Sequence, residues 1–211
     1  MDTPKDCFIK AWGIGYVEQW PYTMPVSDFI KTTVTPFCNK QHVALEVGCG
    51  RGVWTQNCLS PNFKKVICLD VIPKSDWIAQ LPNVEYIELP DRNFSCLGVA
   101  DNSVDFVWSF GCFCHLTMDA VREYLKSLFR VTKRGANLVC MFGNWQKHPN
   151  LIQVDKGAVF PPDQCPWFYQ DLELVKQAIL DAGFMDFVDL VPEVRDTIVH
   201  FKKPPSGVIL I

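Results

Sequence analysis

Short apolar runs alternate with amphipathic segments along most of this chain. Five of the runs are rich in valine, isoleucine and leucine, a composition typical of buried strands. They lie at 43–47, 66–70, 84–89, 104–110 and 137–142. Alternation of buried strands with helical segments predicts an α/β domain with a mainly parallel, doubly wound sheet and helices on both faces.

The clearest helical pattern follows the fourth run. Thr117 is the expected N-cap and Gly135 the expected end of this helix. Apolar residues recur at helical spacing between them. They are Val121, Tyr124, Leu125, Leu128 and Phe129.

Three weaker helical segments and two further strands complete the pattern. Ser27 is expected to cap a helix over 28–37, a second helix is expected over 52–59, and Asp171 should begin a third that ends at Gly183. The last two strands are expected at 187–191 and 197–202.

Two aromatic, proline-containing segments interrupt this alternation. The first is the N-terminal part of the chain and the second is 143–170, which follows the fifth strand. Loops at the carboxyl ends of parallel strands face the ligand crevice, and long loops in compact domains are often functional. We therefore expect a single domain over 1–211, with 1–37 as a lid and 143–170 as a substrate loop. The candidate substrate-binding residues are Trp12, Tyr16, Trp20, Trp145, Trp167 and Tyr169.

Composition narrows the class of protein. Apolar residues form 48% of the 211 residues, enough for a sizeable core, and the net charge of −3 argues against binding to a nucleic-acid backbone. Several of the ten cysteines lie inside apolar runs, which favours reduced thiols and a cytoplasmic location. The first ten residues lack the apolar core of a signal peptide, and no apolar run is long enough to span a membrane.

A glycine-rich turn follows the first predicted strand. Gly48, Gly50 and Gly52 would permit a tight turn and close approach of the backbone to a ligand, and Glu46 lies inside the strand. Asp70 ends the second strand, where a carboxylate can accept hydrogen bonds from both hydroxyls of a ribose. The spacing of glycines differs from the usual dinucleotide-binding pattern, so the two features together indicate another nucleoside-containing cofactor.

These motifs, with 103–108 and 129–136, resemble the successive motifs of class I S-adenosylmethionine-dependent methyltransferases over about 40–142. The resemblance implies a Rossmann-like, seven-stranded sheet with an antiparallel last strand, and S-adenosylmethionine as cofactor. It also implies a ribose site at Asp70, an adenine contact at Val71 or Ile72, and Asp91 beside the adenine amino group. The other cofactor-binding residues that it implies are Glu46, Gly48, Cys49, Gly50, Gly52 and Phe110.

The segment 109–116 should face the methyl group to be transferred. It lacks the motif of enzymes that methylate amino groups of DNA, and Cys112 and Cys114 lack the proline that precedes the nucleophile of cytosine-C5 enzymes. His115 lies where a general base for a hydroxyl acceptor could act. A histidine here could instead shape the pocket or cap the next helix, and His148 is the second candidate base.

The segments 113–116, 122–125 and 167–169 resemble small methyltransferases that modify glycans. Among these is the sugar O-methyltransferase domain of a large algal-virus glycan-assembly protein, which implies a rhamnose hydroxyl as acceptor. A phenol or carboxylate acceptor and a non-catalytic cofactor-binding scaffold remain alternatives. Because no dense carboxylate cluster occurs in the sequence, no metal is expected.

Overall fold

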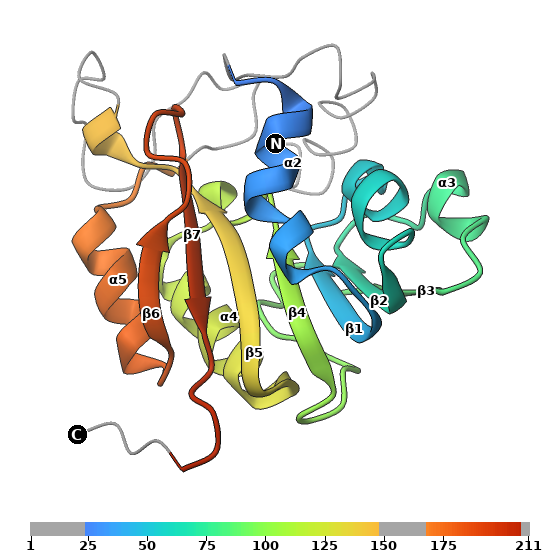
Figure 1. Ribbon diagram of the computed structural model, residues 1–211. Coiled ribbons are helices and arrows are strands. Elements are labelled where there is room, and N and C mark those ends of the chain that lie inside the picture. Colours follow the sequence, from blue (N-terminus) through green and yellow to red (C-terminus); the bar gives the residue numbers. More distant parts are fainter. Residues whose placement is uncertain (1–23, 148–167, 208–211) are drawn as a thin grey trace.

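A seven-stranded sheet forms the centre of the computed structural model, which describes residues 24–147 and 168–207 (Figure 1). The strand order is β3-β2-β1-β4-β5-β7-β6. Only β7 runs antiparallel to its neighbours among the pairs formed by the described residues, which confirms the predicted sheet. The strands are β1 (Asn39–Val47), β2 (Phe63–Asp70), β3 (Val84–Glu88), β4 (Val104–Ser109), β5 (Thr132–Phe142), β6 (Met185–Asp189) and β7 (Thr197–Lys202).

Helices cover both faces of this sheet, as the alternating pattern predicts (Figure 1). One face packs against α4 (Met118–Val131) and α5 (Leu172–Asp181). The other packs against α2 (Val26–Thr33), the turn η3 (Thr55–Leu59) and α3 (Asp76–Ala79). Three short 3-10 turns complete the described elements: η2 (Thr35–Phe37), η4 (Phe113–His115) and η5 (Trp145–Lys147).

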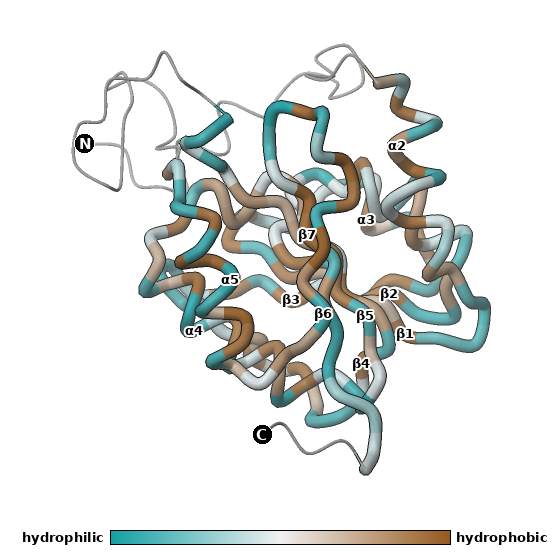
Figure 2. The backbone as a smooth tube through the Cα atoms, turned by 60° about the vertical axis from the view of Figure 1, so that its left-hand side comes forward, coloured by the Kyte–Doolittle hydropathy of each residue, from teal (hydrophilic) through white to brown (hydrophobic). Residues whose placement is uncertain are grey.

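Strand β1 shows how the sequence pattern produces these two layers. Successive side chains of a strand point to opposite faces. Leu45 and Val47 therefore join the core beneath α4 and α5, whereas Ala44 joins the core beneath α2. Figure 2 shows apolar residues along the central strands and polar residues on the outer turns.

Two helix boundaries differ from the predictions. Helix α2 begins at Val26, directly after Pro25, whose carbonyl accepts the N–H of Phe29 at 3.0 Å; Ser27 lies inside the helix. The helix ends at Thr33 because Pro36 lacks an N–H donor and disfavours helical backbone before it. The helix expected over 52–59 is present over 53–59, and its last five residues form the π-helical turn η3.

The expectation that Gly135 ends α4 is wrong. Helix α4 begins as predicted, with the Thr117 hydroxyl accepting the N–H of Ala120, but it ends at Val131 and Gly135 lies within β5. The backbone explains the early end, since Gly135 N–H donates to the Lys203 carbonyl and Lys203 N–H donates to the Ala136 carbonyl, both at 3.0 Å. These bonds hold the segment in the sheet.

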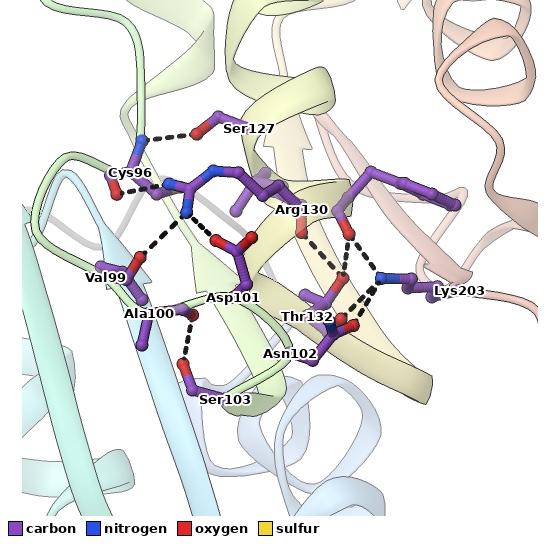
Figure 3. Close-up of polar contacts among 12 residues, drawn as sticks. Cys96, Val99, Ala100, Asp101, Asn102, Ser103, Ser127, Arg130, Thr132 and Lys203 are labelled. Atoms are coloured by element: carbon purple, nitrogen blue, oxygen red, sulfur yellow. Dashed lines mark hydrogen bonds and ion pairs between the residues drawn. The ribbon is translucent and has the colours of Figure 1, made fainter.

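Two basic side chains stabilise the end of the sheet at which β4 and β5 begin (Figure 3). Lys203 Nζ donates to the carbonyls of Phe129 and Thr132 at 2.6 and 2.7 Å, and so satisfies acceptors at the end of α4. Arg130 donates to the carbonyls of Cys96 and Val99 at 3.1 Å and pairs with Asp101. The loops that follow the parallel strands lie at the other end of the sheet, where these strands stop.

Within 24–147 and 168–207, no helix is long and apolar enough to cross a membrane.

Candidate active site

The glycine turn follows β1 and has left-handed backbone at all three glycines. The φ angles of Gly48, Gly50 and Gly52 are +73°, +55° and +88°. A Cβ at Gly48 would lie 2.4 Å from Cβ of Cys112, and one at Gly52 would lie 2.4 Å from Cγ1 of Ile78. A Cβ at Gly50 would meet no atom of residues 24–147 and 168–207 within 4 Å. The middle glycine therefore faces open space, whereas the outer two are packed against the protein.

Asp70 closes the turn from the end of β2. Its Oδ2 accepts the N–H of Gly50 at 2.6 Å, and its Oδ1 accepts the N–H groups of Val71 and Ile72 at 2.7 and 3.2 Å. A carboxylate offers about four lone-pair sites, so capacity for a further donor remains. Burial raises the pKa of Asp70, and the three backbone N–H groups oppose this rise.

Glu46 lies beneath the same turn and is 1% exposed. Its register partner on β2 is Cys68, and Oε2 accepts the hydroxyl proton of Thr55 from η3. Burial raises the pKa of Glu46 well above its usual range, and the Thr55 bond opposes that rise. The carboxyl group is therefore held in an environment that disfavours its charge.

The predicted cofactor residues do not all lie together. One group lies where β1 and β2 end. It contains Glu46, Asp70 and the turn from Gly48 to Gly52 with the buried Cys49, and Val71 follows Asp70 directly. Asp91 lies exposed in the turn after β3 and makes no hydrogen bond to this group among the described residues. Phe110 packs into an aromatic cluster, with ring centroids 5.0 Å from Trp54 and 5.5 Å from Phe29.

His115 lies at the end of η4, in the loop that follows β4. The side chain is 9% exposed, and its backbone N–H donates to the Cys112 carbonyl at 2.9 Å. Cys112 is also the residue against which Gly48 is packed. The turn that carries His115 therefore adjoins the glycine turn through Cys112.

Only part of the predicted substrate surface falls within the described residues. Trp145 is 39% exposed in η5, and Tyr169 is half-buried, with the pKa of its hydroxyl raised by burial. The other predicted substrate and base residues lie outside the described residues. They are Trp12, Tyr16, Trp20, His148 and Trp167.

Sequence reasoning missed two residues of this site. Thr55 binds Glu46 from nine residues away, and Gln170 binds the carbonyls of Phe113 and Leu116 from more than fifty residues away. A hydroxyl near a glycine turn and a glutamine before a helix carry no distinctive sequence signal.

The described residues hold no group of three or more histidine, cysteine, aspartate or glutamate side chains able to bind a metal ion.

Comparison with known proteins finds a family model that matches the central part of the chain. Residues 45–140 match the family model described as a methyltransferase domain. That region includes the glycine turn, Asp70 and His115. No curated protein matches the chain in sequence.

Several solved structures share the fold at low sequence identity. An S-adenosylmethionine-dependent methyltransferase from Methanosarcina mazei is 16% identical with a TM-score of 0.61, over 87% of this chain and 99% of that one. The [4+2]-cyclase SpnF is 14% identical with a TM-score of 0.60, over 86% and 80% of the two chains. The 1,6-didemethyltoxoflavin-N1-methyltransferase of Burkholderia thailandensis, solved with its namesake ligand and S-adenosylhomocysteine, is 16% identical with a TM-score of 0.59, over 78% and 72%.

The structural matches show the fold, and the family model is similar to the part of the chain that contains the glycine turn. The matched region spans β1 to β5 and so contains both parts of the arrangement in which Asp70 binds the glycine turn. This region matches a methyltransferase domain and the complete sheet has the class I order, so the sequence match and the fold both indicate an S-adenosylmethionine-dependent methyltransferase.

Proposed function

We propose that this enzyme methylates a hydroxyl group of a sugar, with His115 as the general base. The observation that carries the proposal is the buried histidine in the turn after β4, which adjoins the glycine turn through Cys112. A hydroxyl must lose its proton when its oxygen is methylated, and the usual pKa of histidine suits it to accept that proton near neutral pH.

The open face at Gly50 and the remaining acceptor capacity of Asp70 support a nucleoside site at this edge. Nothing lies within 4 Å of a Cβ at Gly50, so the backbone there can be approached closely by a ligand. The Asp70 carboxylate, held by three backbone N–H groups, is oriented to accept further bonds from ribose hydroxyls. Val71 is assigned to the adenine by its position, and Asp91 is a second adenine candidate.

Glu46 suits the cationic end of the cofactor. A buried carboxyl whose pKa is raised regains its charged form when a positive group lies within about 4–6 Å. The methionine ammonium is such a group. We assign Glu46, Gly48, Cys49 and Gly52 to the methionine side of the site, and Phe110 to its aromatic wall.

The chemistry of the chain itself is orientation and proton removal. S-adenosylmethionine, when bound, supplies a methyl group on a positively charged sulfur. His115 accepts the proton of the acceptor hydroxyl, and the surrounding residues hold that oxygen in line and exclude water. His148 is the alternative base.

The assignment of a sugar acceptor rests on resemblance and on residue types. The segments 113–116 and 122–125 resemble glycan-modifying methyltransferases, including the viral rhamnose-modifying domain. Aromatic side chains at Trp145 and Tyr169 suit the C–H faces of a sugar ring. They suit a planar acceptor equally, so a phenol or carboxylate metabolite is the second candidate.

Incubation with S-adenosylmethionine and either methyl rhamnoside or catechol separates these candidates by mass spectrometry. We expect the mass gain of one methyl group on the rhamnoside, lost in His115→Gln and retained in His42→Gln, a partly exposed histidine on β1. Gain on catechol alone would transfer the proposal to the phenol class. Cofactor binding without gain on any acceptor would favour the scaffold alternative.

A further inference from the structure

The two ends of the 143–170 insertion meet beside the active-site turn. Gln170 N–H donates to the Gly143 carbonyl at 2.9 Å, and Trp145 N–H lies 3.4 Å from the Gln170 carbonyl. An isolated parallel bridge pairs Asn144 with Gln170. We call these two short segments, 143–145 and 168–170, the neck of the insertion. The two segments of the neck are therefore held together by backbone hydrogen bonds.

The neck also binds the turn that carries His115. Phe168 N–H donates to the Cys114 carbonyl at 2.6 Å, and Gln170 Nε2 donates to the carbonyls of Phe113 and Leu116 at 3.1 and 3.0 Å. Carbonyls at the end of a short helix need donors from outside it. Here the carbonyls of Phe113 and Cys114 in η4 and of Leu116, its C-cap, receive these bonds from two residues of the neck.

The amide of Gln170 has no other polar contact in the described part of the chain. Both donor positions of Nε2 face carbonyl oxygens, which fixes the orientation of the amide. Oε1 is buried and has no hydrogen-bond partner among residues 24–147 and 168–207. The two donated bonds are the contribution of this amide that the described residues show, and both hold η4.

We propose that Gln170 is a positioning residue that fixes His115 through the backbone on both sides of it. This rests on the proposed role of His115 as base. A substitution that removes the two donated bonds should displace the imidazole without disturbing the glycine turn.

Imidazole NMR spectra test this without any acceptor. The four histidines give separate ring signals, and His115→Gln identifies the one that belongs to His115. Gln170→Leu and Gln170→Met both keep a side chain of similar size and remove the Nε2 donors. The matched control is Gln177→Leu on α5, where Nε2 donates to Asp181 at the exposed surface. Circular dichroism shows which of the two Gln170 variants is folded, and that variant is used. Titration with S-adenosylhomocysteine measures cofactor affinity and so tests whether the glycine turn is intact.

We expect the His115 ring signals to move in the Gln170 variant and to stay in the control, with His200 unchanged and cofactor affinity within about twofold. Methyl transfer to the acceptor identified above should fall on the order of 10²-fold, as for a misplaced catalytic group. Unmoved His115 signals, or equal movement of every histidine, would overturn the proposal. Full activity in His115→Gln would instead remove the proposed base, while the NMR comparison would still decide whether Gln170 positions this turn.

Discussion

The backbone N–H of Gly50 donates a 2.6 Å hydrogen bond to Oδ2 of Asp70, and this bond joins the turn after β1 to the end of β2. It sets the open glycine beside a carboxylate that can accept further bonds. The same atoms that shape the turn are therefore those assigned to the ribose, so a change at either residue should affect cofactor binding first.

Cofactor affinity should fall as the pH is lowered. Burial raises the pKa of Asp70, so the unliganded protein takes up a proton at higher pH than an exposed aspartate would. Ribose hydroxyls donate to the ionised carboxylate, so protonation competes with binding. Calorimetric titration of S-adenosylhomocysteine from about pH 8 downward checks this, and an affinity that stays constant while the protein remains folded would contradict it. Glu46 titrates in the same site, and a pH dependence that persists in Asp70→Asn would belong to Glu46.

Alanine at Gly50 and at Gly48 should have different effects. Both glycines have left-handed backbone, which costs about 1–2 kcal/mol for an L residue. At Gly50 the added methyl meets no protein atom, so the variant should fold but lose most of its cofactor affinity. At Gly48 the methyl would overlap Cys112, so this variant should also lose stability. Thermal unfolding and calorimetry on both variants separate the two effects, and equal loss of stability would count against the open face at Gly50.

Glu46→Gln should stabilise the fold above the usual pKa of glutamate. The folded-state pKa of Glu46 is raised, so its contribution to stability is present below the unfolded-state value and is lost as the pH rises toward the folded-state value. Glutamine keeps an acceptor for Thr55 and has no charge to bury. Each unit by which the pKa is raised corresponds to about 1.4 kcal/mol. Urea unfolding at about pH 8 and pH 4.5 should show a gain for the variant at the higher pH that shrinks at the lower one; the reverse trend would refute this account of Glu46.

Lys203→Met should lower the stability of the fold, because Lys203 lies where β4 and β5 begin, at the end of the sheet away from the glycine turn. Methionine fills similar space but leaves the Phe129 and Thr132 carbonyls without their donor (Figure 3). We expect a loss of about 1–3 kcal/mol in the free energy of unfolding, with cofactor affinity unchanged. The control is Lys202→Met, where a part-exposed ion pair with Asp186 should contribute about 1 kcal/mol or less. An equal loss of unfolding free energy in the two variants would contradict a stabilising role for the buried hydrogen bonds of Lys203.

The sequence pattern predicted the fold well because the strands obey local rules. Apolar runs followed by turns locate β1 to β5, and the glycines with Asp70 are recognisable by spacing alone. The caps at Thr117 and Asp171 also follow local chemistry and are confirmed. Local rules fail where distant residues decide the outcome. Pairing with Lys203 draws residues 132–136 into β5 and ends α4 before Gly135.

The site could be predicted only in part for the same reason. Gly48, Gly50 and Asp70 are close in sequence to the strands that position them. Gln170 reaches Phe113 across more than fifty residues, and no periodicity relates the two. Phe110 also depends on packing, since its neighbours Phe29 and Trp54 come from separate segments.

The most direct test of the account is calorimetric titration of S-adenosylhomocysteine into three proteins: the wild type, Asp70→Asn, and Asp76→Asn, an exposed aspartate in the first turn of α3. Asparagine removes the charge and one acceptor oxygen from the position that binds Gly50. We predict one binding site in the wild type, a loss of about 1.5–3 kcal/mol in binding free energy for Asp70→Asn, and wild-type affinity for Asp76→Asn. Wild-type affinity in Asp70→Asn would contradict the assignment of the cofactor to this edge of the sheet.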